Sequence, residues 1–398
     1  MTGRQKTPGG ESALRRVKRQ LGPVQVLKLS ARSLPQLHGA LGRAVRRPVQ
    51  ALARRELRKM TADERGEALR FVRGCRAITE ARQQIIQSAD VRWALASYLK
   101  CLEYWARGAK LQALLISPLL PRTLDGKPVT ALDLAWWLQN DNLGCQSGLV
   151  RTAGDRILFW HTEEDRRGAV DRPRLLSATV GGKRYWSFLY PQLLPGGAFS
   201  WTGHRFQAVD SLYVRLGKNA PGVLANAAAW IALWFGERLP LSAVARALRP
   251  MADGYAINWV IRGERAVRGE RVEFGGRSLL RSPLPGRTGS ALIQANCVSD
   301  RHSTLWRKFN YATARKDRLL RNRLKRSWQY LGRCFRQSGT LTIPALQTLL
   351  ASRQGGAYGY ANADVKAYCF GEATPVGISV YVGSGPALVS DQPPRFGW

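Results

Sequence analysis

The sequence is poor in acidic residues and in histidine, and it lacks long hydrophobic runs. Its 398 residues include 27 Asp and Glu against 62 Lys and Arg, which gives a formal charge of +35. A surface with this charge repels itself, so we expect a polyanionic partner, with nucleic acid favoured over an anionic membrane. Hydrophobic residues still make up 45% of the chain, which is enough for a folded core.

Three further absences narrow the class of protein. The longest apolar stretch, Val223 to Phe235, is too short to cross about 30 Å of hydrocarbon and predicts a buried helix. Residues 1–9 lack the apolar segment of a secretory signal, so we expect a cytoplasmic, nucleoid-associated protein with no membrane partner. The six cysteines are far apart, which predicts reduced thiols rather than a zinc module or a disulfide framework.

Signatures of common catalytic sites are also missing. The four histidines stand singly, so the metal-binding His-x-His pair of a rolling-circle nickase is absent, and no phosphate-binding Gly-Lys-Ser/Thr loop occurs. The densest acidic group, Glu163-Glu164-Asp165, is followed by two arginines, and we interpret it as a solvated turn rather than a magnesium site. We therefore predict a protein that is not an enzyme, with no catalytic residues, no metal and no cofactor. An active site assembled from distant residues carries no such local signature.

Composition divides the chain into four predicted parts. They are a basic N-terminal arm with short helices on either side of Pro48 (1–60), a first domain (61–205), a second domain (206–372) and a Pro/Gly-rich tail (373–398). A capping box at Thr61 to Glu64 begins a long helix. Strand patterns follow at 156–160, 176–180 and 184–190, and an Ala-rich helical pattern covers 208–236.

Residues 240–247 repeat the pattern of residues 128–135 at an offset of 240 − 128 = 112 residues. Both segments read Pro, aliphatic, Ser/Thr, Ala, aliphatic, two variable positions and Ala, and an amphipathic helix precedes each. A hydroxyl cap that opens a short helix in this setting is typical of the second helix of a helix-turn-helix. The same pattern also begins many ordinary helices. On the first interpretation, Ser242, Arg246 and Arg249 contact nucleic acid.

A long basic helix is predicted from about residue 304 to 337. Residues 301–336 contain twelve Lys and Arg and one acid, Asp317. An apolar stripe predicts the packed face, and it consists of Leu320, Leu324, Trp328, Leu331 and Phe335. A second face at the same period carries Arg315, Arg318, Asn322, Lys325 and Gln329. Cations at one-turn spacing suit phosphate contacts, and the two amide side chains suit base edges if the helix enters a groove.

The predicted nucleic-acid contacts of this helix are Arg307, Lys308, Arg315, Lys316, Arg318, Arg321, Asn322, Lys325 and Arg326. A purely solvated helix would more often alternate Glu with Lys to form i, i+4 ion pairs. We therefore interpret the cationic face of this helix as a binding surface rather than as a face that only contacts solvent.

The order of the predicted elements resembles that of plasmid replication initiators. A strand-rich stretch is followed by a helix from Leu212, a short helix opened by Ser242, the basic helix, and the segment Gly339 to Ile343. That family consists of two winged-helix domains, so the resemblance implies an α+β, mostly helical fold: two winged-helix-like domains with small antiparallel sheets, after a basic helical N-terminal region. It implies sequence-specific binding to duplex DNA at origin repeats, with host replication proteins as partners and a homodimer as the inactive form. The segment 251–297 and the long basic arm depart from that pattern.

A structural RNA-binding protein is the alternative. Residues 230–236 followed by Leu239-Pro240-Leu241 resemble a helical segment of RNA-phage maturation proteins, which have a similar length. The thirteen tryptophans also offer surfaces on which unpaired bases can stack. Tryptophans at helical spacing more often belong to the core, so we expect most of them to be buried.

Overall fold

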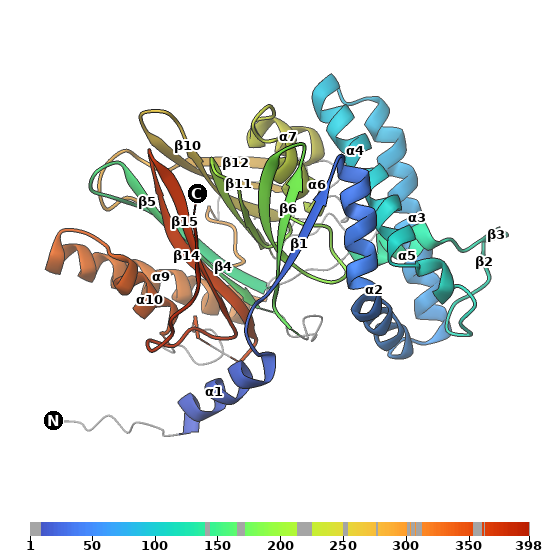
Figure 1. Cartoon of the computed structure of the whole chain (residues 1–398), viewed down its shortest axis with the longest axis horizontal. Coiled ribbons are helices and arrows are strands. Elements are labelled where there is room, and N and C mark those ends of the chain that lie inside the picture. The colour runs from blue at the N-terminus through green and yellow to red at the C-terminus, as the bar shows by residue number, and fades with distance from the viewer. Residues whose placement is uncertain are drawn as a thin grey trace.

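The computed structural model contains two large β-sheets with helices on both outer sides (Figure 1). It describes residues 9–139, 144–164, 172–212, 225–249, 254–275, 278–300, 303, 307, 313–352, 360–361 and 363–397. Within these ranges no helix is both long enough and apolar enough to cross a bilayer.

The helices are of very different lengths. They are α1 (Gly9–Leu21), α2 (Leu34–Arg58), α3 (Ala62–Gln84), α4 (Ala89–Gly108), the 3-10 helix η1 (Leu111–Leu114), α5 (Ala131–Gln139), α6 (Ala225–Phe235), α7 (Leu241–Leu248), α9 (Ala314–Ser338) and α10 (Ile343–Leu350).

The strands form sheets of eight, six and two strands among the described residues. The larger sheet has the order β1 (Gln25–Ala31), β6 (Arg174–Val180), β7 (Lys183–Leu189), β8 (Phe199–Trp201), β9 (Arg205–Ser211), β10 (Tyr255–Arg262), β11 (Val267–Gly275), β12 (Ser278–Pro283). The second has the order β13 (Ala291–Gln294), β4 (Gly144–Thr152), β5 (Arg156–Glu164), β14 (Val365–Thr374), β15 (Gly377–Ser384), β16 (Arg395–Gly397). The small hairpin pairs β2 (Thr123–Leu124) with β3 (Lys127–Pro128).

The prediction of a mostly helical fold with two winged-helix-like domains and small sheets is therefore wrong. The protein is α+β, and its centre consists of two extended sheets that pack face to face. The predicted helical stretch 208–236 begins in strand β9, which ends at Ser211, and includes helix α6 from Ala225; residues 213–224 lie outside the described residues. Local sequence patterns identified many strands correctly, but they do not show that strands far apart in the chain join one sheet.

Three hydrophobic clusters hold four layers together. The largest lies between the helical layer and the eight-stranded sheet and contains Trp105, Trp136 and Trp230. The second fills the space between the two sheets, and the third joins the six-stranded sheet to α9 and α10. The fully buried tryptophans are Trp105, Trp136, Trp160, Trp201, Trp230 and Trp259, so the expectation that most are core residues is confirmed for these.

Helix α2 is one continuous helix, although we predicted two helices separated by Pro48. The buried residues Val45 and Val49 flank this proline, and their burial in the main core cluster stabilises the helical backbone despite the missing N–H donor.

Two glycines let α2 and α4 approach closely. A Cβ atom on Gly42 would lie 2.3 Å from the carbonyl oxygen of Trp105, and one on Gly108 would lie 2.2 Å from that of Gly39.

The N-terminal residues do not form a separate arm in the described part of the chain. Strand β1 is the edge of the eight-stranded sheet and pairs in parallel with β6, with Gln25 opposite Arg174. Helix α1 lies against the other end of the chain, where Lys18 forms an ion pair with Asp391. The predicted boundary at 205/206 falls at the start of β9, and the eight-stranded sheet takes strands from both sides of it.

Candidate nucleic-acid interface

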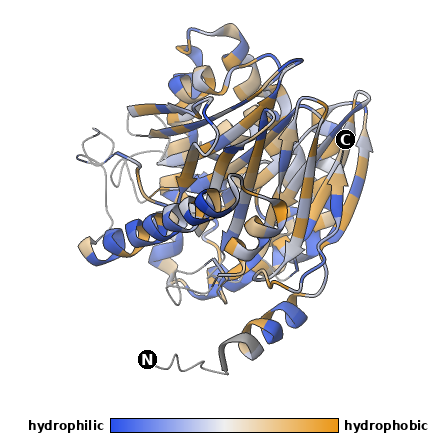
Figure 2. Ribbon diagram, turned by 90° about the vertical axis from the view of Figure 1, so that its left-hand side faces the viewer, coloured by the Kyte–Doolittle hydropathy of each residue, from blue (hydrophilic) through white to orange (hydrophobic). Residues whose placement is uncertain are grey.

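Helix α9 lies on the outer face of the six-stranded sheet, beside α10 (Figure 1). The Thr313 side chain accepts a hydrogen bond from the Lys316 backbone N–H at its start, and Gly339 ends it in a left-handed conformation. Its buried residues are Asp317, Leu320, Arg323, Ser327 and Leu331. The side of the molecule that carries α9 faces the viewer in Figure 2, where the long helix in front is mainly hydrophilic.

The predicted polar face of this helix is exposed. Arg315, Arg318, Asn322, Lys325 and Gln329 all lie on the solvent side, as the sequence period predicted. Arg326 is exposed as well. The predicted apolar stripe needs one correction, because the Trp328 side chain is 46% exposed and lies on the cationic side.

Some of the predicted contacts already have protein partners. The Arg321 guanidinium lies 2.9 Å from an Asp317 carboxylate oxygen, and it also donates a hydrogen bond to the Val298 carbonyl. Arg323, next to it, is buried and pairs with Glu164 of β5 at 2.9 Å. Arg323 attaches α9 to β5, Arg321 contacts the segment that follows β13, and the cations further around the helix face solvent.

The other predicted contacts lie elsewhere. Ser242 and Arg246 belong to α7, which packs on β11 and β12 on the far side of the eight-stranded sheet, and Arg249 directly follows that helix. Ser242 does not cap this helix: its N-cap is Pro240, without a side-chain hydrogen bond. Both sheets separate α7 from α9, so one duplex groove does not receive both helices. Arg307 is exposed, whereas Lys308 lies outside the described residues.

Next to the exposed cations is a cavity of about 320 Å³ between α9 and the end of α10 with the residues that follow it. Arg326, Tyr330 and Arg333 line it from α9, and Ser352 lies on the opposite wall. The Arg333 guanidinium lies over the Tyr330 ring at 5.9 Å from its centre. A cationic and aromatic wall of this kind suits a planar, negatively charged ligand such as a nucleotide.

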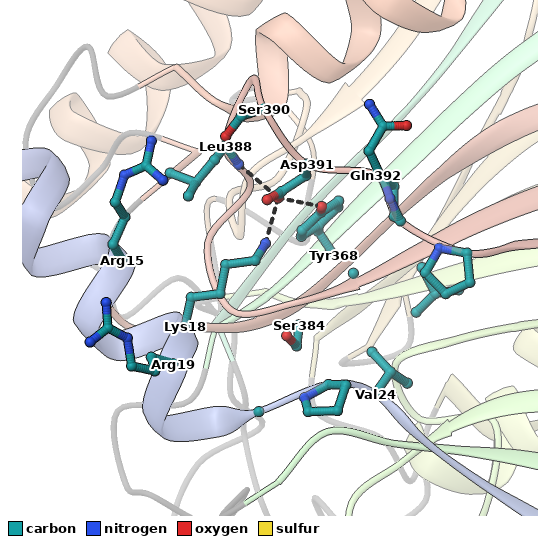
Figure 3. Close-up of a pocket in the computed structure, with 16 residues that line it drawn as sticks. Arg15, Lys18, Arg19, Val24, Tyr368, Ser384, Leu388, Ser390, Asp391 and Gln392 are labelled. Carbon is teal, nitrogen blue, oxygen red and sulfur yellow. Dashed lines mark hydrogen bonds and ion pairs between the residues drawn. The ribbon is translucent and has the colours of Figure 1, made fainter.

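A second basic cavity lies between α1 and the C-terminal segment, with a volume of about 550 Å³ (Figure 3). Arg15, Lys18 and Arg19 line one side of it. Asp391 lies opposite and accepts hydrogen bonds from Lys18 and from the Tyr368 hydroxyl. The carboxylate offsets part of the positive charge, so this cavity is a weaker anion site than the surface of α9.

Between the two sheets lies a buried polar cluster that the sequence analysis missed. Cys145, His161 and Glu163 are fully buried, and their donor atoms lie within 4.8 Å of one another. The interpretation of Glu163-Glu164-Asp165 as a solvated turn is wrong for its first two residues, because Glu163 and Glu164 are buried at the end of β5; Asp165 lies outside the described residues. The alternation His161-x-Glu163 within a strand pattern was the available signal, since it places both side chains on one face.

No protein-family model matches the chain, and no curated protein matches it.

Proposed function

We propose that this protein binds RNA through the exposed face of α9 and that it is a structural RNA-binding protein rather than a DNA-binding initiator. The observation that carries the proposal is the cationic face of α9, with Trp328 exposed among its arginines and lysines. Exposed aromatic rings beside cations stack unpaired bases while the cations contact phosphates. A duplex keeps its bases stacked and offers this tryptophan no partner.

The corrected fold does not add support for duplex DNA. The resemblance to initiators, with their host replication partners and their homodimer, implied a mostly helical fold with small sheets, and the protein instead contains two extended sheets. The segment that resembles RNA-phage maturation proteins forms the end of α6 and the start of α7. This resemblance supports a role for the protein in an RNA-containing assembly.

The test compares RNA binding by the native protein with binding by two variants of equal charge. In the first, Arg315, Arg318, Lys325 and Arg326 are all replaced by Gln. In the control, four exposed arginines of α2, which lies in the helical layer, are replaced in the same way; they are Arg43, Arg47, Arg54 and Arg58. For single strands, log K falls by about 0.7 per neutralised phosphate for each decade of salt. We expect the α9 variant to lose roughly 3 from this slope and the control to keep the native slope.

A single substitution, Trp328→Ala, tests the stacking contact. Base–aromatic stacking contributes about 1–3 kcal/mol per base, so we expect RNA affinity to fall about 5- to 150-fold while the salt slope stays unchanged. Trp93→Ala, at the other strongly exposed tryptophan of the described chain, is the control.

Competition with duplex DNA at about 0.2 M salt decides between the nucleic acids: stronger competition by DNA than by RNA contradicts the proposal.

A further inference from the structure

The buried cluster between the sheets contains the three donor types that proteins use for zinc. Cys145 offers a sulfur, His161 a ring nitrogen and Glu163 a carboxylate oxygen. The Cys145 Sγ lies 3.2 Å from Glu163 Oε1, and His161 Nε2 lies 2.7 Å from Glu163 Oε2. Ligand atoms of a tetrahedral zinc site are about 3.3–3.6 Å apart. The Cys145–Glu163 separation is close to this range, and the His161 ring must move away from Glu163 by roughly 0.6 Å or more to reach it.

The sheet fixes these donors in place. Cys145 of β4 is directly opposite Glu163 of β5 in the antiparallel ladder, and His161 is two residues from Glu163 on the same face of the strand. The Tyr190 hydroxyl donates a hydrogen bond to Glu163 from the facing sheet. Three donors from neighbouring ladder positions, with a further group that orients the carboxylate, form a preorganised site.

The charges around the cluster also favour a cation. Asp210 of β9 is fully buried near His161 and Glu163, and it accepts a hydrogen bond from Ser147. Loss of hydration on burial raises the pKa of Asp210 to about 6, and the nearby Glu163 carboxylate adds to this rise. Within the described chain, Asp210 Oδ1 and His161 Nδ1 have no hydrogen-bond partner. Protein groups alone therefore leave this network incompletely satisfied.

We propose that Cys145, His161 and Glu163 bind one zinc ion that links the strands of the six-stranded sheet beneath the facing sheet. Binding requires Cys145 to lose its thiol proton, which leaves to solvent during folding, and the thiolate forms the bond to the metal. The ion is structural, because all three ligands are fully buried. This inference is independent of the proposed RNA binding.

The experiment measures metal in the full chain as it folds in cells. Protein is produced in medium supplemented with zinc and purified without chelators or a histidine tag, and its zinc content is determined by mass spectrometry. We expect about one zinc per chain. Production with cobalt in place of zinc should give the absorption band of a thiolate bound to Co²⁺.

Cys145→Ser should reduce the bound zinc at least tenfold and remove the cobalt–thiolate band. The matched control is Cys369→Ser, because Cys369 of β14 is also buried and lies opposite His161, outside the proposed ligand set. If Cys145→Ser does not fold, Glu163→Gln replaces it and should reduce zinc at least tenfold. If the native protein contains less than 0.1 zinc per chain, the proposal is wrong, and hydrogen bonds alone hold the cluster together. Zinc retained by the ligand variants overturns it as well.

Discussion

His38 shows how strongly burial fixes the protonation state of one residue. Its ring is fully buried in the helical layer, where Nδ1 donates to the Leu34 carbonyl and Nε2 accepts from the Trp230 indole N–H at 2.9 Å. This arrangement requires the neutral ring, since a second ring proton would face the indole proton. Burial accordingly lowers the pKa of His38 to about 4.

The resulting pH dependence can be measured. The unfolded chain takes up a proton at His38 near pH 6.5, whereas the folded chain does so only near pH 4. The unfolded state therefore binds more protons between these values, and stability falls as the pH drops through this window. The loss is about 3 kcal/mol by pH 4 and is absent above pH 7.

Urea unfolding from pH 7 to pH 4 tests this expectation. His38→Gln should remove about 3 kcal/mol of the pH dependence of the unfolding free energy, whatever its effect at pH 7. His204→Gln, at an exposed histidine, is the control and should keep the native profile. Parallel profiles for native protein and His38→Gln would show that His38 does not carry this dependence.

At the scale of residues, the sequence predicts whether a side chain is exposed better than it predicts which residue that side chain contacts. Helical periodicity placed Arg315, Arg318 and Lys325 on the solvent side correctly, because a long helix on a flat sheet buries one face only. It misplaced Trp328, since hydrophobicity alone does not show how wide the buried face is. It also gave no sign that Arg323 pairs with Glu164, a residue 159 positions away.

At the scale of elements, the contact between α2 and α4 depends on glycine. Gly42→Ala would place its methyl group 2.3 Å from the Trp105 carbonyl oxygen and 2.8 Å from the Ala109 nitrogen, so the helices must separate. We expect a loss of about 1–3 kcal/mol in the free energy of unfolding, the usual range for overpacking.

Gly74→Ala, in α3, is the matched control. Its methyl group would meet nothing within 4 Å, and alanine favours the helix over glycine by about 0.5–1 kcal/mol. The two variants should therefore shift the urea midpoint in opposite directions. A Gly42→Ala midpoint at or above that of the native protein would contradict the close packing of α2 on α4.

Elements with local signals were predicted well. The capping box at Thr61 is present at the start of α3. Strands β5 and β6 include the segments predicted at 156–160 and 176–180, and β7 covers the segment predicted at 184–190 except for its last residue. Which helices and strands lie next to one another could not be predicted in the same way. Nothing in the sequence near Gln25 indicates a parallel partner at Arg174, because that pairing depends on how all the intervening layers pack.

At the scale of the whole molecule, a formal charge of +35 should give salt two opposite effects. Salt screens the repulsion among cations of the free protein, so we expect the melting temperature to rise between about 0.05 and 0.3 M NaCl. The same change weakens RNA binding because it reduces the gain from counterion release. Thermal scans with and without RNA measure both effects, and a melting temperature of the free protein that falls with salt would contradict the first.

The ion pair between Lys18 and Asp391 has a consequence for synthesis on the ribosome. Its partners are 373 residues apart, so at 5–20 residues per second Lys18 waits roughly 20–75 s for Asp391 to be made. Helix α1 therefore cannot form this contact until Asp391 has been synthesised. The nascent chain carries a basic amphipathic helix without its partner throughout this time, and α1 is then accessible to chaperones or to RNA.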